Sequence, residues 1–336
     1  MGSVGIIANP HSGKDARRIV ADATTVGNHD KVGIVRRIFR VLARFGIERV
    51  VMMPDEFGIG PRAQERVPIH LDLLDIPITG SDADSILAAR LMAPQVSCLI
   101  TIGGDGTNRA VALGTTAVPL IPVSTGTNNV FPNHLDGTIV GLAAAGLALG
   151  AVRASEVCRR AKVITVELDG EEIDLALVDA AVTTEPFVGV RAIWQSQILR
   201  YLLLTQAQPY SLGLSSIGGL LEPVDRFDAA GLAVMLGEPG RTLLAPLAPG
   251  LLEPVSVREW QKVPIGFRHE EVARVAGTIA LDGERTREYL PGQRVGLALS
   301  DRGPLVVSVQ SVLGLLAERG FLRADGTSRV VDSRPA

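Results

Sequence analysis

Short apolar runs alternate with helical patterns through the first half of the chain, and this alternation limits the fold most. Val96–Ile102 and Val118–Val123 are uncharged and largely apolar, which is typical of strands buried on both faces of a parallel sheet. The pattern predicts one helix over Lys31–Phe45, after the apolar run Val4–Ala8. It predicts another over Asp82–Met92, just before Val96–Ile102. Strands separated by helices predict a Rossmann-like parallel α/β domain, which we place over residues 1–153.

The pattern changes near residue 155. Lys162–Leu168 and Ile173–Val182 flank Asp169-Gly170, a pair that favours the tight turn of a β-hairpin. Short strand-like runs separated by Gly and Pro follow, and they indicate an antiparallel β-sandwich-like domain over residues 154–310. The runs are Leu232–Leu236, Thr278–Leu281, Val295–Leu299 and Leu305–Val309.

Two helices are expected in this second half. Arg191–Thr205 is apolar enough for one helix, and Ser311–Arg319 has the pattern of a closing helix. The closing helix and the tail after it form a C-terminal segment, 311–336. The whole chain of 336 residues therefore suits two domains and a short terminal extension.

Composition excludes several classes of protein. A hydrophobic fraction of 46% and a net charge of −3 indicate a globular chain with a large core. Residues 1–150 hold 13 basic and 13 acidic side chains, so they lack the basic excess of a nucleic-acid-binding surface. Two cysteines exclude a disulfide framework and suit a reducing compartment. With no secretory signal and no apolar run fit to span a membrane, we expect a cytoplasmic protein that binds neither nucleic acid nor membrane.

Three loops rich in Gly, Asn, Ser and Thr follow predicted strands. In an open α/β sheet, ligands bind beyond the carboxyl ends of the strands, so these loops should converge. Glycines let the backbone approach a phosphate, and the next helix offers free N–H donors. A tight turn that binds nothing is the alternative for each loop. The candidate phosphate-binding residues are Asn9, Ser12, Gly13, Lys14, Gly103, Gly104, Gly106, Thr107, Ser124, Thr125, Gly126, Thr127 and Asn128.

Asp105 is an acid placed between glycines directly after a buried strand. A carboxylate there would repel phosphate unless it binds Mg²⁺ or takes a proton from an attacking hydroxyl, so it indicates phosphoryl transfer. The usual nucleotide motifs do not fit. A Walker A loop would need Gly in place of Ala8 and Ser or Thr in place of Asp15, and the dinucleotide fingerprint would need Gly in place of Arg109.

The three loops read "NPHSGK" (Asn9–Lys14), "ITIGGDGT" (Ile100–Thr107) and "STGTNN" (Ser124–Asn129). In this order they resemble the superfamily of NAD kinases, diacylglycerol kinases and sphingosine kinases. The chain is most similar to the NAD-kinase-like group that includes the acetoin-catabolism protein X type. The resemblance implies an N-terminal α/β domain and a C-terminal β-sandwich, with ATP as phosphoryl donor and Mg²⁺ as cofactor. It also implies an active site between the domains and a homo-oligomer.

Leu281-Asp282-Gly283-Glu284 is similar to the Asp-Gly-Glu of the lipid-kinase branch, whose glutamate is thought to act as a base. The resemblance implies catalytic roles for Asp105 and, in reserve, Glu284, with Asp282 as a metal ligand. A purely structural role is the alternative for the second-domain pair. Leu168–Glu171 repeats the tetrapeptide, but there the hairpin turn explains it.

One departure from the family concerns the acceptor. NAD kinases carry an Asn-Glu pair that holds NAD, whereas this chain has Val178-Asp179. Asn129, Asp179 and Tyr210 are the expected acceptor contacts. We predict an ATP-dependent phosphotransferase that phosphorylates a hydroxyl of NAD or a related small molecule, as in NADP biosynthesis. The alternatives are a diacylglycerol or sphingoid-type lipid kinase, and a nucleotide-binding regulator that has lost catalysis.

Overall fold

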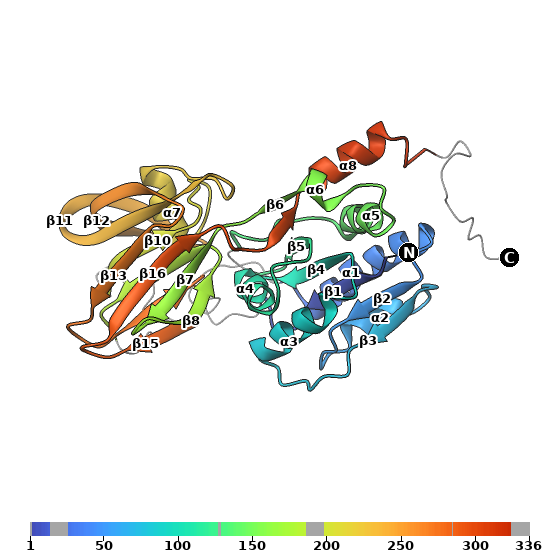
Figure 1. Cartoon of the computed structure of the whole chain (residues 1–336), viewed down its shortest axis with the longest axis horizontal. Coiled ribbons are helices and arrows are strands. Elements are labelled where there is room, and N and C mark those ends of the chain that lie inside the picture. The colour runs from blue at the N-terminus through green and yellow to red at the C-terminus, as the bar shows by residue number, and fades with distance from the viewer. Residues whose placement is uncertain (1, 14–25, 127–128, 186–197, 284, 324–336) are drawn as a thin grey trace.

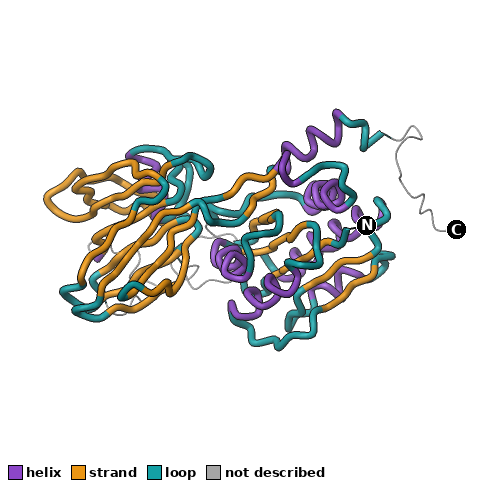
Figure 2. Tube along the Cα trace, viewed as in Figure 1, coloured by secondary structure: helices purple, strands orange, loops and turns teal. Residues whose placement is uncertain are grey.

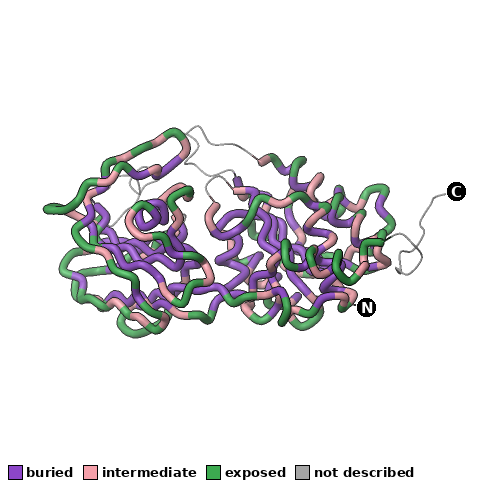
Figure 3. The backbone as a smooth tube through the Cα atoms, turned by 90° about the horizontal axis from the view of Figure 1, so that it is seen from above, coloured by how far each residue is buried: buried purple, intermediate pink, exposed green. Residues whose placement is uncertain are grey.

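The structure is a computed structural model that describes residues 2–13, 26–126, 129–185, 198–283 and 285–323 (Figure 1). An α/β part and a β-rich part lie side by side along the long axis (Figure 2). Buried residues follow the strands of both parts (Figure 3). The expected fold class, a parallel α/β domain with an antiparallel β-rich domain, is confirmed.

The α/β part contains a seven-stranded sheet of order β3-β2-β1-β4-β5-β17-β6. Its first five strands pair in parallel, as the buried apolar sequences of β1, β4 and β5 predict. β17 extends the sheet parallel to β5, and β6 then pairs antiparallel to β17. The strands are β1 (Val4–Ala8), β2 (Arg49–Met52), β3 (His70–Leu73), β4 (Cys98–Gly103), β5 (Leu120–Ser124), β6 (Cys158–Arg160) and β17 (Leu305–Val307).

Helices cover both faces of this sheet. Side chains of α1, α2, α5 and α8 pack on one face, and those of α3 and α4 pack on the other. Among the described residues, no helix is long and apolar enough to cross a membrane. The helices of this part are α1 (Asn28–Arg44), α2 (Ile59–Gln64), α3 (Asp82–Met92), α4 (Asp105–Gly114), α5 (Gly137–Ala148), α6 (Ala154–Val157) and α8 (Val309–Glu318).

The β-rich part consists of two antiparallel sheets that share an apolar core. The six-stranded sheet has the order β12-β11-β10-β9-β14-β15, and the four-stranded sheet has the order β13-β16-β7-β8. Helix α7 (Leu214–Leu221) packs on β10 and β11. The strands are β7 (Val163–Leu168), β8 (Glu171–Ala176), β9 (Asp179–Thr183), β10 (Leu199–Leu204), β11 (Ala230–Ala248), β12 (Leu251–Pro264), β13 (Arg268–Val272), β14 (Gly277–Leu281), β15 (Arg285–Tyr289) and β16 (Arg294–Ser300).

The predicted hairpin is confirmed, with a refinement. Asp169 and Gly170 form its turn with φ angles of +53° and +90°, in the left-handed region that this turn requires. The run predicted as its second strand is divided, because β8 pairs with β7 whereas β9 belongs to the other sheet. The connection between β8 and β9 therefore passes from one sheet to the other.

Two predictions about elements were wrong. The helix expected over Arg191–Thr205 is replaced at Leu199–Leu204 by β10, which lies between β9 and β11; residues 191–197 lie outside the described residues. A short run that is apolar at nearly every position does not distinguish a helix from a buried strand. The run Leu305–Val309 was assigned to the sandwich, but β17 pairs with β5 in the first sheet.

Candidate functional site

The three predicted loops meet at the carboxyl edge of the first sheet, as expected. Asn9 Nδ2 donates to Thr107 Oγ1 at 3.0 Å, which joins the first loop to the second. The hydroxyls of Ser12 and Thr125 lie 3.0 Å apart, which joins the first loop to the third. The N–H of Thr125 donates to the carbonyl of Gly103 at 3.1 Å. These contacts build one surface from three segments distant in sequence.

A buried lysine that the sequence analysis did not identify holds the first loop in place. Lys31 Nζ donates to the carbonyls of Asn9 (2.9 Å), Pro10 (3.3 Å) and Ser12 (2.7 Å). Gly13 ends this turn with φ of +71°, a conformation that favours glycine. The sequence signal was the rarity of lysine in this chain combined with its place in the first turn of α1.

The amino end of α4 faces the converged loops. Gly104 is the N-cap of this helix and, having no side chain, supplies no side-chain bond to its first turn. Gly106 and Thr107 line an adjacent cavity. A Cβ added to Gly103 would lie 2.4 Å from Thr107 Oγ1, so glycine is required for this close packing. The helix end is thus a positively polarised surface suited to an anion.

Asp105 is buried at the start of α4, and backbone groups hold its carboxylate. Its Oδ1 accepts the N–H of Phe131 at 2.8 Å, and its Oδ2 accepts the N–H of Val130 at 3.1 Å. Arg226 donates to the carbonyls of the same two residues, and its ring-facing guanidinium lies 4.6 Å from the Phe131 ring centroid. Asp105 therefore shapes the loop that follows β5.

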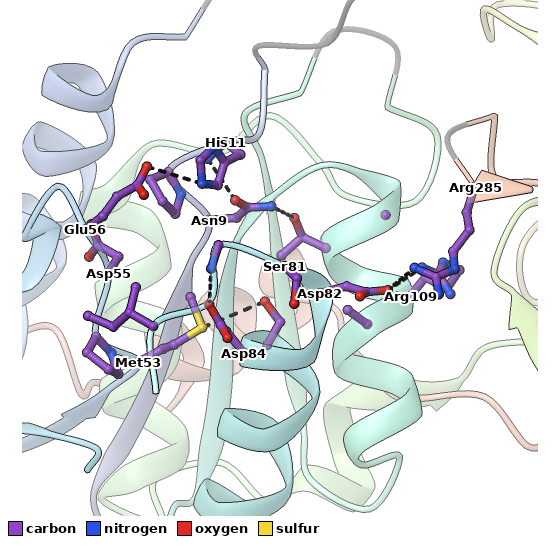
Figure 4. Close-up of a pocket in the computed structure, with 18 residues that line it drawn as sticks. Asn9, His11, Met53, Asp55, Glu56, Ser81, Asp82, Asp84, Arg109 and Arg285 are labelled. Carbon is purple, nitrogen blue, oxygen red and sulfur yellow. Dashed lines mark hydrogen bonds and ion pairs between the residues drawn. The ribbon is translucent and has the colours of Figure 1, made fainter. Parts of the chain in front are cut away.

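A first cavity of about 390 Å³ lies beside α4 (Figure 4). Its lining residues come from the carboxyl ends of β1 and β2, the start of α3 and the first turns of α4, together with Arg285 of β15. Acidic groups of Asp55 and Glu56 stand on one side in Figure 4, and Arg109 and Arg285 stand on the other. Carboxylates therefore lie on one side of the cavity, and its two arginines lie on the other.

The acidic residues of this cavity have partners. Asp84 accepts the N–H groups of Thr79 and Gly80, each at 2.9 Å. Asp55 accepts the N–H of Ile59 at 3.0 Å, and burial nevertheless raises the pKa of its carboxyl. Glu56 lies 3.2 Å from His11 Nε2. These contacts offset part of the negative charge that an incoming phosphate would meet.

A cluster of charged side chains joins the two parts of the molecule next to the cavity. The carboxylate of Asp174 on β8 is fully buried and lies 2.7 Å from Arg109 Nη1, 2.8 Å from Arg287 Nε and 3.4 Å from Arg285 Nε. Arg109 and Arg285 also pair with Asp82 at the start of α3. Arg109 sits one helical turn after Asp105, a spacing from which the sequence could have placed it beside the site.

A second cavity of about 480 Å³ is lined by the loop after β5 and by residues of the β-rich part. Two of the expected acceptor contacts, Asn129 and Tyr210, line it together with Val130 and Arg226. Asn129 Nδ2 donates to Ser124 Oγ at 2.6 Å. Tyr210 is largely exposed. The guanidinium of Arg226 connects the loop to the β-rich part, and burial lowers its pKa.

Two other second-domain candidates, Asp282 and Asp179, do not line either of these cavities. Asp282 has φ of +48°, and its carboxylate accepts the N–H groups of Leu177 (3.0 Å), Val178 (2.8 Å) and Asp179 (3.3 Å). Burial raises the pKa of the Asp282 carboxyl to about 6. These bonds brace the crossing from β8 to β9 and account for Asp282 without the expected metal. Asp179 is buried on β9 and does not line either cavity.

Four candidates lie outside the described residues: Lys14, Thr127, Asn128 and Glu284. Within the described residues, no group of three or more His, Cys, Asp or Glu side chains could hold a metal ion. Backbone N–H groups already engage the carboxylates of Asp105 and Asp282. The described side chains therefore do not fit a metal site held by the protein alone.

Comparison with known proteins agrees with this architecture. Residues 4–139 match the ATP-NAD kinase N-terminal domain, and residues 162–302 match the acetoin catabolism protein X C-terminal domain. The chain is 41% identical over 338 residues to acetoin catabolism protein X of Cupriavidus necator (strain H16), covering 96% of this chain and 94% of that protein. The chain belongs to the acetoin catabolism protein X family. The resemblance predicted from the three loops is confirmed.

Solved structures place this acetoin catabolism protein X family member among proteins of the NAD kinase fold. Yeast NADH kinase, in complex with NADH, matches with a TM-score of 0.54 and 14% identity, covering 96% of this chain and 89% of that one. A diacylglycerol kinase from Bacillus anthracis str. Sterne has a TM-score of 0.48 and 12% identity, with 91% and 96% covered. At such identities the likeness concerns the fold alone.

Proposed function

We propose that this protein is an ATP-dependent phosphotransferase that phosphorylates a hydroxyl of NAD or a related small molecule. The match of residues 4–139 to a kinase domain supports phosphotransferase chemistry of the NAD kinase type. The first cavity would receive the nucleotide donor, and the second would receive the acceptor. ATP is the donor that the family resemblance implies.

Asp105 adjoins residues that line both cavities, and this is the observation that carries the proposal. Its neighbour Gly106 lines the first cavity, and Val130, whose N–H it accepts, lines the second. A group transferred from donor to acceptor would pass beside this carboxylate. Phosphoryl transfer depends mainly on positioning and charge stabilisation. A carboxylate whose neighbours line both cavities is suited to position the two reactants.

The residues around Asp105 and at the amino end of α4 have separate proposed roles in the reaction. The N–H groups of Gly106 and Thr107 in the first turn of α4, with the side chains of Asn9 and Thr107, would bind the donor phosphates. Asp105 would accept the proton of the attacking hydroxyl, a role that contributes about 10²–10⁴-fold to a rate. Magnesium would enter bound to the phosphates, as it commonly does in phosphoryl-transfer sites.

A nucleotide-binding regulator without turnover is a second candidate. It is favoured by the backbone bonds of Asp105, which give that carboxylate a structural role as well. Val178 stands where NAD kinases carry asparagine, and it is fully buried. This position therefore offers no amide side chain to hold NAD. The lipid-kinase alternative has no comparable support among the described residues.

The decisive experiment is incubation of the purified protein with Mg·ATP and a panel of acceptors. NAD, NADH, nucleosides and diacylglycerol would be scored by mass spectrometry for a gained phosphoryl group. We expect a phosphorylated product from NAD or a smaller relative, and its loss in Asp105→Asn. Binding of ATP without any phosphorylated product would favour the regulator, and a phosphorylated diacylglycerol would favour the lipid kinase.

A further inference from the structure

Arg285 brings a positive charge from the β-rich part into the first cavity. The other residues that line this cavity all lie between Asn9 and Ala110, whereas Arg285 begins β15. Figure 4 shows it beside Arg109, on the side opposite Glu56. Its side chain is 37% exposed, so a molecule in the cavity could reach the guanidinium.

The contacts of Arg285 leave donor capacity. Its Nη1 donates to Asp82, and its Nε lies 3.4 Å from Asp174 Oδ2. A guanidinium has five N–H donors, and no bond from Nη2 is found within the described part of the chain. Arg109, Arg285 and Arg287 place three positive charges against two carboxylates, Asp82 and Asp174, so this cluster carries an excess of positive charge. The cavity lining as a whole does not, because Asp55, Glu56 and Asp84 also line it.

A second observation concerns Arg109, which also lines the cavity. Its side chain is 4% exposed, and its Nε has no hydrogen-bond partner among the described residues. A buried guanidinium with an unsatisfied donor is costly unless a ligand or water completes its bonds. Both arginines of this wall are therefore suited to an anion.

We propose that Arg285 binds the terminal phosphates of the nucleotide donor, so that the β-rich part takes a direct part in donor binding. This inference rests on the proposed function, which places the donor in the first cavity. Arginine binds phosphate through two parallel N–H bonds, and such charge-assisted bonds are stronger than neutral ones. A phosphate would share the guanidinium with Asp82, which already lies at the cavity wall.

Arg287 provides a matched control. It lies two residues further along β15, on the same face of the strand, and its Nε lies 2.8 Å from the same Asp174 carboxylate. Its side chain is 35% exposed, close to the value for Arg285. It does not line the cavity. Replacing Arg287 removes one ion pair from the cluster and replacing Arg285 removes two, but both remove a pair to Asp174 and only Arg285 lines the cavity.

The test compares calorimetric binding of ATP, ADP, AMP and adenosine, with magnesium, to the wild type, R285Q, R285K and R287Q. We expect R285Q to bind ATP about tenfold more weakly or worse, ADP and AMP with smaller losses, and adenosine unchanged. R285K should recover part of the ATP affinity because it keeps the charge. R287Q should bind all four ligands like the wild type.

Three results would overturn the inference: wild-type ATP affinity in R285Q, an equal loss for adenosine, or an equal loss in R287Q. The proposed function fails differently. If R285Q shows the phosphate-dependent loss of affinity but the wild type transfers no phosphoryl group, Arg285 still binds the phosphates and the kinase proposal is wrong. If the wild type binds none of the four ligands, both fall together.

Discussion

At the scale of single residues, Asp105 combines a proposed chemical role with a structural one. Its carboxylate accepts N–H groups of Val130 and Phe131, so it fixes the loop that lines the second cavity. Sequence alone indicated an acid suited to proton transfer but gave no sign of these bonds. The structure therefore changes the expected outcome of the simplest substitution at this position.

Asp105→Asn should lower both turnover and stability. Turnover should fall about 100-fold or more, because the amide cannot accept the proton of the attacking hydroxyl. The amide NH₂ would also face a backbone N–H, and an unsatisfied buried donor costs about 1–3 kcal/mol. Steady-state rates and chemical denaturation would measure the two effects.

Asp136→Asn is the matched control for this prediction. Asp136 caps α5 at the exposed surface, where it accepts the N–H of Thr138 at 2.7 Å. Its replacement should lower the free energy of unfolding by about 1 kcal/mol or less, because asparagine also caps helices, and it should leave turnover unchanged. Full turnover in Asp105→Asn would show that Asp105 is not the base.

The sequence identified the residues that local pattern can reveal. Asn9, Thr107 and Thr125 follow apolar strands, and the rule that loops converge at one edge of a parallel sheet brought them together. It did not identify Arg285, whose partner Asp82 is 203 residues away along the chain. Contacts of that kind depend on how the two parts pack, and no local pattern encodes them.

At the scale of elements, α1 stabilises the loop that precedes it through a single buried side chain. Lys31 lies in the first turn of α1 and donates to three carbonyls of the first loop. The central strands β1, β4 and β5 of the first sheet were predictable because they are apolar and are followed by Gly, Pro, Asn or Thr. β10 was not, because Leu199–Leu204 is apolar on both faces and fits either a helix or a strand.

Lys31→Met should weaken donor binding more than it slows the chemical step. Without the ammonium, the carbonyls of Asn9, Pro10 and Ser12 lose a common donor, and the loop no longer holds Asn9 against Thr107. We expect the KM for ATP to rise about tenfold, the value of one or two lost hydrogen bonds. Lys262→Met is the control, because Lys262 is exposed and pairs with Glu222 at 3.3 Å. Equal KM values in both variants would contradict this role.

At the scale of the whole molecule, charged groups hold the two parts together. Asp174 lies on β8 of the β-rich part, and its buried carboxylate pairs with Arg109 of the α/β part. The expected domain order was predictable from the change of pattern near residue 155. The return of β17 to the first sheet was not, because a three-residue strand carries no mark of which sheet it joins. The cytoplasmic location and the homo-oligomeric state remain predictions.

Asp174→Asn should destabilise the molecule strongly. The substitution leaves the buried guanidinium of Arg109 with a weaker partner, and breaking a buried pair costs about 3–5 kcal/mol. Urea unfolding would measure the loss. Asp169→Asn in the turn of the same hairpin is the control, because Asn tolerates the left-handed conformation there. A loss below 1 kcal/mol for Asp174→Asn would show that the cluster does not hold the two parts together.

Lys162 should make stability depend on pH in the alkaline range. It is buried at the start of the β-rich part and donates to the carbonyls of Asp225 and Ala230. Burial lowers its pKa to about 8 from an unfolded value of 10.5, so between these pH values the unfolded chain binds more protons. The free energy of unfolding should therefore rise with pH in this window. Lys162→Met should remove that rise, and equal slopes in both proteins would refute the assignment.

The return of the chain to its first sheet has a consequence for how the protein is made. β5 acquires its second neighbour only when Leu305–Val307 is present, and Leu316 of α8 packs against Gly146 of α5. The carboxyl end of β5 pairs early, because Val123 bridges to Asn133. The edge at Leu120 stays unpaired until the whole β-rich part has left the ribosome, and open strand edges favour aggregation. We expect a nascent chain stalled near residue 153 to engage holding chaperones. Final closure of the nucleotide-binding half would come last, after translation of about 150 further residues.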